Sequence, residues 1–281
     1  MNKSGFTLVE LSIVLVVIGL LIGGILVGRS LIDSAKINKQ IQQIEQIQIA
    51  VNQFKNKFKS LPGDTTKLGS GGAQPTATTA GNNDGRILGY IFHNNVQADV
   101  YNLSGNNQWI FNTGWRSEWT SVFDHLALVK MYKFEQYTET STALTNRYPG
   151  IMYPKMIVPS NASGTDIVPI GGVVVGYEPG PVANINAGHK IKLGQCPSSI
   201  TWSQHSDFWC GPNPVDAAAI DNKLDDGNPY TGSVYITAIY TYRVPNGLVG
   251  NDTNACGNST TNKYRVTSTT ANCIPTIDAN F

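Results

Sequence analysis

An unbroken apolar segment lies close to the start of the sequence. It runs from Phe6 to Val27 as FTLVELSIVLVVIGLLIGGILV, 22 residues with one charged side chain, that of Glu10. As an α-helix, a segment of this length extends about 33 Å, enough to cross the hydrocarbon core of a bilayer, about 30 Å thick. A cleavable secretory signal has a shorter apolar region, and a helix buried in a soluble domain is rarely apolar on all sides. The segment therefore predicts one transmembrane helix over residues 6–27.

Glu10 is the informative residue of this segment. A carboxylate at the centre of a bilayer costs about 2.5–3.5 kcal/mol, and somewhat less near an interface. The run from Phe6 to Val27 contains no Lys, Arg or His that could neutralise it. The sequence therefore predicts neutralisation by another chain, by a newly formed amino terminus or by protonation. Alternatively, Glu10 is a tolerated interfacial charge on an ordinary membrane anchor.

The residues around Glu10 resemble a known processing signal. The sequence Lys-Ser-Gly-Phe-Thr-Leu-Val-Glu at 3–10 is similar to the N-terminal segment of type IV prepilins and of type II secretion pseudopilins. The resemblance implies that residues 1–5 are a leader, which prepilin peptidase removes after Gly5 before it methylates the new amino terminus on Phe6. It also implies that Thr7 and Glu10 belong to the assembly segment, with Glu10 meeting the N-terminal amine of a neighbouring subunit.

Four glycines in and directly after the apolar run form two G-x-x-x-G pairs, Gly19 with Gly23 and Gly24 with Gly28. Such pairs let helices approach closely in lipid. Glycine also softens a helix, so local bending explains the same residues equally well. The sequence leaves both interpretations open.

The charges that flank the apolar run do not fix its orientation. Lys3 precedes the run, whereas Arg29, Lys36 and Lys39 follow it, which by simple counting opposes a cytoplasmic amino terminus. Large domains cross largely regardless of nearby charge, and four cysteines without metal-binding spacing suit an oxidising compartment. With the resemblance, we expect a single-pass protein of the bacterial inner membrane, with a periplasmic C-terminal domain that later enters a pilus or pseudopilus.

Helical periodicity continues beyond the apolar run. Apolar residues recur at steps of three and four, which indicates one face of an amphipathic helix: Ile37, Ile41, Ile44, Ile47, Val51, Phe54, Phe58 and Leu61. No proline intervenes before Pro62, and Leu61-Pro62-Gly63-Asp64 provides a stop. We therefore predict one long helix over residues 6–60, transmembrane in its first part and docked on a domain in its second.

Residues 61–281 are expected to form a globular extracytoplasmic domain with long loops. Charged residues make up 14% of the chain, against about 25% in an average soluble protein, and 28 Gly and 14 Pro favour many turns. The patterns predict a helix over 117–132, a short helix over 216–227 capped by Asp216, and strands within 166–177, 233–244 and 263–270. The predicted class is α+β, a long helix packed on an antiparallel sheet, which is the pilin-like arrangement that the resemblance implies.

The four cysteines all lie in the last third of the chain and include no C-x-x-C pair. This spacing does not match zinc fingers or thioredoxin-like redox sites. Four cysteines allow three disulfide pairings, and short closures favour Cys196 with Cys210 and Cys256 with Cys273.

Cofactor and catalytic motifs are sparse. Asp221, Asp225 and Asp226 are weak calcium candidates, because Leu224 falls where the calcium-loop pattern requires a ligand; turn chemistry is favoured, and no other cofactor is expected. G-x-S-x-G, H-E-x-x-H and phosphate-loop motifs do not occur, and the neighbours Ser203, His205, Ser206 and Asp207 do not make a triad by adjacency. His125 is interpreted as structural. The chain is therefore predicted not to be an enzyme.

The favoured function is a structural one. A net charge of +1 gives no electrostatic footprint for nucleic acid. The resemblance implies a subunit of a type IV pilus or pseudopilus, whose partners are prepilin peptidase, the inner membrane and other pilin subunits. The large body after the helix favours a minor or tip subunit. The alternative is a membrane-anchored adhesin, glycan-binding domain or enzyme that uses the helix only as a tether.

Overall fold

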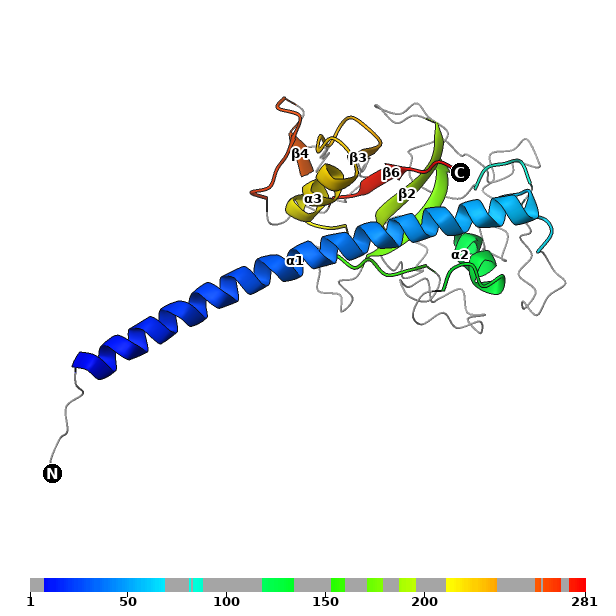
Figure 1. Cartoon of the computed structure of the whole chain (residues 1–281). Helices are drawn as coiled ribbons and strands as arrows, with labels where there is room; N and C mark the ends of the chain where they lie inside the picture. The colour runs from blue at the N-terminus through cyan, green and yellow to red at the C-terminus, as the bar shows by residue number, and fades with distance from the viewer. Residues whose placement is uncertain are drawn as a thin grey trace, which may run out of the picture.

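One long helix dominates the structure, a computed structural model of the chain (Figure 1). The structure describes residues 8–68, 81, 83–87, 118–133, 153–159, 171–178, 187–195, 211–236, 256–258, 260–268 and 273–281. Helix α1 runs from Leu8 to Phe58 without a break, 51 residues, and curves gently over its length. Its first part projects away from the rest of the molecule, and its second part lies across the folded domain. The predicted long helix is thus confirmed from Leu8 to Phe58; Lys59 and Ser60, which the prediction included, lie outside it.

The end of α1 follows the expected stop signal. Lys59 adopts a left-handed backbone conformation, with φ of 57°, and its N–H donates a 2.8 Å hydrogen bond to the carbonyl of Lys55. This is the αL motif, in which the residue after the C-cap turns the chain out of the helix. Pro62 then prevents further helical hydrogen bonding.

An antiparallel sheet faces the docked part of α1. It consists of β1 (Gly172–Glu178), β2 (Gly188–Gln195), β6 (Pro275–Asp278) and β3 (Val234–Ile236), in the spatial order β1-β2-β6-β3. In the registers, Ile191 lies between Val175 on β1 and Ile277 on β6, and Ile277 pairs on its other side with Val234. A second, two-stranded sheet pairs β4 (Gly257–Asn258) with β5 (Lys263–Tyr264). The α+β class and the antiparallel sheet are confirmed.

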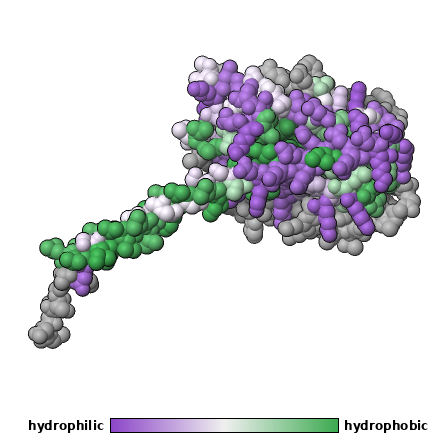
Figure 2. Space-filling view, in the orientation of Figure 1, coloured by the Kyte–Doolittle hydropathy of each residue, from purple (hydrophilic) through white to green (hydrophobic). Residues whose placement is uncertain are grey.

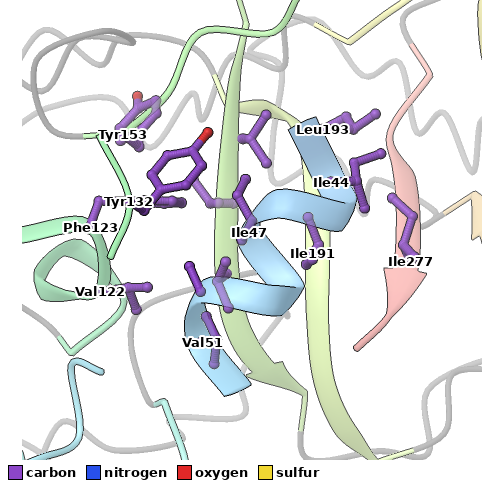
Figure 3. Packing of buried hydrophobic residues seen from close by; sticks show 14 of the residues in the cluster. Ile44, Ile47, Val51, Val122, Phe123, Tyr132, Tyr153, Ile191, Leu193 and Ile277 are labelled. Atoms are coloured by element: carbon purple, nitrogen blue, oxygen red, sulfur yellow. The ribbon is translucent and has the colours of Figure 1, made fainter. Parts of the chain in front are cut away.

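The main core lies between α1 and this sheet. Ile44, Ile47 and Val51 on α1 point toward Ile191 and Leu193 on β2, with Ile277 on β6 beside them (Figure 3). Helix α2 (Glu118–Leu128) closes another side of the core with Val122 and Phe123. All these side chains are at most 5% exposed. The amphipathic face predicted for α1 is the face that is buried, with Ile41 and Phe58 partly buried at its margins.

His125 ties α2 to the end of α1. Its Nδ1 accepts a 2.8 Å hydrogen bond from the N–H of Gly63, and its ring stacks on Phe54 with 6.2 Å between ring centroids. Gly63 has φ of 90°, a conformation that favours glycine, and it packs closely against α2. These contacts give His125 the structural role that was expected of it.

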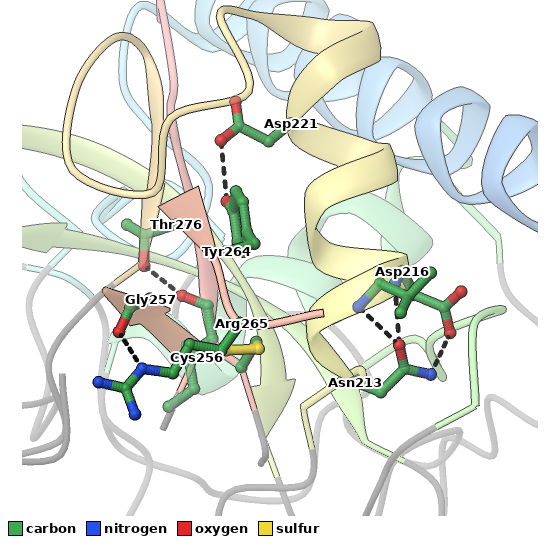
Figure 4. The surroundings of a disulfide bond; sticks show 11 residues. Asn213, Asp216, Asp221, Cys256, Gly257, Tyr264, Arg265 and Thr276 are labelled. Carbon is green, nitrogen blue, oxygen red and sulfur yellow. Dashed lines mark hydrogen bonds between the residues drawn. A yellow bond between two sulfur atoms is a disulfide. The ribbon is translucent and has the colours of Figure 1, made fainter. Parts of the chain in front are cut away.

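Helix α3 (Pro214–Leu224) begins two residues before the start predicted for it. Its N-cap is Asn213, whose Oδ1 accepts 2.9 Å hydrogen bonds from the N–H groups of Val215 and Asp216 (Figure 4). The assignment of Asp216 as the cap was therefore wrong, because Pro214 fits the first helical position and leaves the capping role to the preceding asparagine. Lys223 on α3 reaches Asn38 on α1 with a 2.7 Å hydrogen bond.

Candidate assembly surface on the first helix

The first part of α1 forms an exposed apolar surface, here called the exposed shaft, residues 8–35. No residue of the shaft is buried, and the first buried side chain of α1 is that of Ile37. Figure 2 shows a mostly apolar shaft that projects from a domain whose visible face is largely hydrophilic. A helix in a protein core would bury such side chains, so the shaft is available for lipid or for other helices.

Within the described residues, α1 is the one helix that is long and apolar enough to cross a membrane. None of the apolar stretch that meets this criterion is buried inside the structure. This distinguishes the shaft from the buried core helix of a soluble protein. It is consistent with membrane anchoring.

Glu10 lies in the first turn of α1 and is exposed. The N-terminal end of a helix carries a partial positive charge, which favours a carboxylate in this position. Helix geometry places the carboxylate at the distal end of the shaft, far along α1 from the folded domain. Gly5, Phe6 and Thr7, the other residues of the predicted signal, lie outside the described residues.

The four glycines of the shaft face open space in the single chain. A Cβ atom added to Gly19, Gly23, Gly24 or Gly28 would meet nothing within 4 Å. At 100° per residue, the pair Gly19/Gly23 and the pair Gly24/Gly28 lie on different faces, about 140° apart. Each face could receive a neighbouring helix closely. Since α1 also curves along its length, bending stays an equally good explanation of the glycines.

A disulfide joins Cys256 to Cys273, the second of the two pairs favoured from the sequence, with 5.5 Å between their Cα atoms (Figure 4). Both cysteines are buried, in a small cluster with Ala217 and Tyr264. The N–H of Cys273 donates a 2.9 Å hydrogen bond to the carbonyl of Pro212, so the disulfide links the β4 region to the segment that leads into α3. Cys196 and Cys210 lie outside the described residues.

The structure brings the three calcium candidates together. Oxygen atoms of Asp221, Asp225 and Asp226 lie within 4.8 Å of one another at the C-terminal end of α3. All three already accept hydrogen bonds from their own surroundings. Asp225 accepts from the backbone N–H groups of Ser233 and Val234, and Asp226 accepts from the hydroxyl of Thr231 at 2.6 Å and from the N–H of Asn228 at 2.8 Å.

Asp221 differs from the other two because its side chain is buried. It accepts hydrogen bonds from the hydroxyl of Tyr264 at 2.8 Å and from the N–H of Gly227 at 3.2 Å. Burial raises the pKa of Asp221 to about 6, against the opposing effect of these hydrogen bonds. The pKa of Asp226 is lowered, mainly by the hydrogen bond from Thr231. The cluster is a hydrogen-bonded turn that closes the end of α3 onto β3.

A second buried histidine, His189, also has a structural partner. His189 is buried, and its Nε2 accepts a 3.3 Å hydrogen bond from the N–H of Ile87. Burial lowers its pKa to about 4, with help from the positive charges of Lys55 and Lys190, so the ring is neutral at pH 7. The polar neighbours Ser203, His205, Ser206 and Asp207 lie outside the described residues.

Comparison with known proteins gives one match. Residues 1–26 match the family model described as the prokaryotic N-terminal methylation motif. No curated protein and no solved structure matches the chain. The motif supports a type IV pilin-like or pseudopilin protein and points to a structural role. At residues 1–26, therefore, this chain carries the prepilin-type cleavage and methylation segment.

Proposed function

We propose that the chain is a minor or tip subunit of a type IV pilus or pseudopilus. Prepilin peptidase removes residues 1–5 and methylates Phe6, and the processed subunit enters the filament through its exposed shaft. The observation that carries the proposal is the combination of the methylation motif with a helix that leaves its apolar half outside the fold. In a soluble domain such a helix would expose its apolar side chains to water. In a membrane or in the helical core of a filament, the same side chains would be buried.

Glu10 supplies the specific chemistry of assembly in this proposal. In the membrane its carboxylate lies near the edge of the hydrocarbon region, where a charge is costly. Cleavage after Gly5 creates a positively charged amine on Phe6, four residues before Glu10 along the chain. The amine of one subunit then neutralises the carboxylate of the next in a low-dielectric contact. Thr7 lies between the two groups in the same segment.

The subunit waits in the bacterial inner membrane with its C-terminal domain in the periplasm, and the disulfide between Cys256 and Cys273 suits that oxidising compartment. The domain that follows α1 occupies residues 61–281, which is large for a major subunit and favours a minor or tip position. The largest pseudopilins of secretion systems generally lack this acidic residue, so Glu10 argues against the chain being one of them.

Intact mass spectrometry of the protein from its native host tests the processing step. The expected mass lacks Met1–Gly5 and carries one added methyl group. The matched control is Gly5→Leu, which should keep the full leader because the peptidase cleaves after a small residue in this family. A wild-type mass that still includes residues 1–5 would favour the helix as a plain tether and contradict the proposal.

We propose no resident cofactor for the domain. The three clustered carboxylates are engaged by the hydroxyl of Tyr264, the hydroxyl of Thr231 and several backbone N–H groups. Calcium would have to displace or share these hydrogen bonds. The melting temperature should therefore be the same in millimolar calcium and in chelator; a rise of several degrees with calcium would show that the turn holds an ion.

A further inference from the structure

Two charged residues bracket the central part of the exposed shaft. Glu10 and Arg29 are separated by 18 residues without a charge, and both side chains are exposed. Helix α1 is unbroken over this stretch. The two Cα atoms therefore lie about 28 Å apart along the helix, close to the thickness of a bilayer hydrocarbon core, about 30 Å. The two charges fit the two opposite boundaries of one bilayer.

The apolar stretch of the shaft is longer than a bilayer requires. It continues beyond Arg29 to Leu31 and Ile32, which are 66% and 57% exposed. A hydrocarbon core placed over residues 6–27 encloses Glu10, and one placed over residues 11–32 encloses Arg29. A charge inside the hydrocarbon is costly. A core over residues 11–28 encloses neither charge, so the charges select this depth among those that the apolar stretch permits.

Three cations follow the apolar stretch, and they differ in their surroundings. Lys36 forms an ion pair with Asp33 at 3.2 Å, whereas Arg29 forms no ion pair within the described part of the chain. Lys39 lies about 15 Å beyond Arg29 along α1, farther than the thickness of a headgroup layer, about 5–8 Å. Arg29 is thus the cation at headgroup depth. A guanidinium there matches a phosphate group, which it binds through two parallel hydrogen bonds.

Arg29 projects from the side of α1 that carries the domain. It lies eighteen residues before Ile47, which is fully buried, and eighteen residues are about five full helical turns. The first buried residue of α1, Ile37, follows Arg29 by about 12 Å along the axis. The domain therefore begins just outside the headgroup layer, above the leaflet that Arg29 reaches.

We propose that Arg29 is a lipid-binding residue. Its guanidinium holds the phosphate of a phospholipid in the leaflet next to the domain, and this contact sets the depth of the shaft in the membrane before assembly. Glu10 lies at the opposite boundary. The inference rests on the proposed function only in that the shaft crosses a membrane; it requires neither cleavage of the leader nor a filament.

Solid-state NMR tests the contact on the full-length chain in vesicles of phosphatidylethanolamine and phosphatidylglycerol. Dipolar recoupling is measured between isotope-labelled arginine Cζ atoms and lipid phosphorus, which a guanidinium–phosphate pair holds about 4 Å apart. The wild type should show recoupling that Arg29→Lys abolishes, since all the other arginines follow α1 in the sequence. Equal recoupling in the two proteins, or none in the wild type, would overturn the assignment of a lipid phosphate to Arg29.

A spin label tests the positioning role. A nitroxide attached to Ser34→Cys reports its depth in the same vesicles through its relative accessibility to oxygen and to a water-soluble nickel chelate. In Arg29→Leu the whole stretch 11–32 can enter the hydrocarbon, so the label should move about 3–6 Å toward it. Arg29→Lys should keep the wild-type depth, because lysine also places a cation at the boundary. An unchanged depth in Arg29→Leu would contradict the positioning role.

Lys39→Gln is the matched control, an exposed cation on the same helix outside the headgroup layer. It should change neither the recoupling nor the depth of the label. A chain that is released from the vesicles by alkaline extraction would contradict the membrane role of the shaft and this inference together. A chain that stays inserted, with recoupling and depth independent of Arg29, would contradict the lipid contact alone and leave the proposed function standing.

Discussion

The hydroxyl of Tyr264 on β5 donates a 2.8 Å hydrogen bond to Oδ2 of Asp221 on α3, and both side chains are buried (Figure 4). This bond connects the β4–β5 hairpin, which the disulfide Cys256–Cys273 also holds, to the end of the helix. It therefore couples the acidic turn at residues 221–227 to the rest of the small cluster. The consequences of this bond depend on pH, because burial raises the pKa of Asp221 to about 6.

Tyr264→Phe should destabilise the domain more at pH 7.5 than at pH 5. The folded pKa of Asp221 lies above its ordinary value, so stability decreases as pH rises from about 4 to 6 and the carboxyl ionises. Removing the hydroxyl leaves the ionised form less well solvated, which raises this pKa further. We expect a loss of about 1–3 kcal/mol at pH 7.5 and a smaller loss at pH 5, measured by urea denaturation.

Tyr177→Phe is the control for this measurement. The described side-chain contacts of Tyr177 are made by its ring, which lies near the Arg86 guanidinium and against His189. Its loss of stability should be small and equal at the two pH values. A loss in Tyr264→Phe that does not change with pH would show that Asp221 is not the group whose ionisation the hydroxyl supports.

The contribution of His189 to stability changes with pH in the opposite direction to that of Asp221. Burial lowers its pKa to about 4, so the folded protein resists protonating it while the unfolded chain takes up a proton near pH 6.5. Stability from this group is complete above about pH 6.5 and decreases as pH falls toward 4. His189→Gln keeps an acceptor for the N–H of Ile87 and has no such titration. Relative to the wild type, the loss of unfolding free energy in His189→Gln should therefore be about 1–3 kcal/mol smaller at pH 4.5 than at pH 7.5.

An uncharged core variant calibrates the His189 measurement. Ile47→Val changes packing alone and should have the same effect at both pH values. If the deficit of His189→Gln stayed constant between pH 7.5 and pH 4.5, the ring of His189 would be as easily protonated in the folded protein as in the unfolded chain, contrary to its burial.

Substitutions of two isoleucines on α1 test which face of the helix packs against the domain. Ile47 is fully buried, whereas Ile49 is 55% exposed on the same helix. Ile47→Ala should cost about 2–5 kcal/mol in the free energy of unfolding, through lost burial and the cavity left behind. Ile49→Ala should stay within about 0.5 kcal/mol. Similar losses in both variants would mean that α1 docks with another face.

The sequence predicted α1 well because its signal is long and local. Apolar residues at steps of three and four predicted the buried face from Ile37 to Leu61, and the apolar run before it predicted the exposed shaft. Neither depends on contacts between distant parts of the chain. The same holds for the methylation motif, whose residues are contiguous.

Strands β2 and β6 were missed, although β2 carried a usable pattern. Lys190-Ile191-Lys192-Leu193 alternates polar and apolar residues, and Ile191 and Leu193 are fully buried. The strand was not predicted because it contains two lysines, and lysine is rarely buried. In the structure Lys190 is 2% exposed and forms an ion pair with Asp278 on β6. β6 is short, and its partners lie far away in sequence, so its pairing was not readable locally.

The most direct test of the assembly account is Glu10→Gln, scored by the amount of the subunit in sheared filaments. The variant should be processed and methylated normally, yet its incorporation should fall by more than tenfold, because the amine on Phe6 of one subunit loses its charged partner on the next. Glu45→Gln is the control, an exposed glutamate on the docked part of α1. Normal incorporation of Glu10→Gln, at the level of Glu45→Gln, would contradict the account.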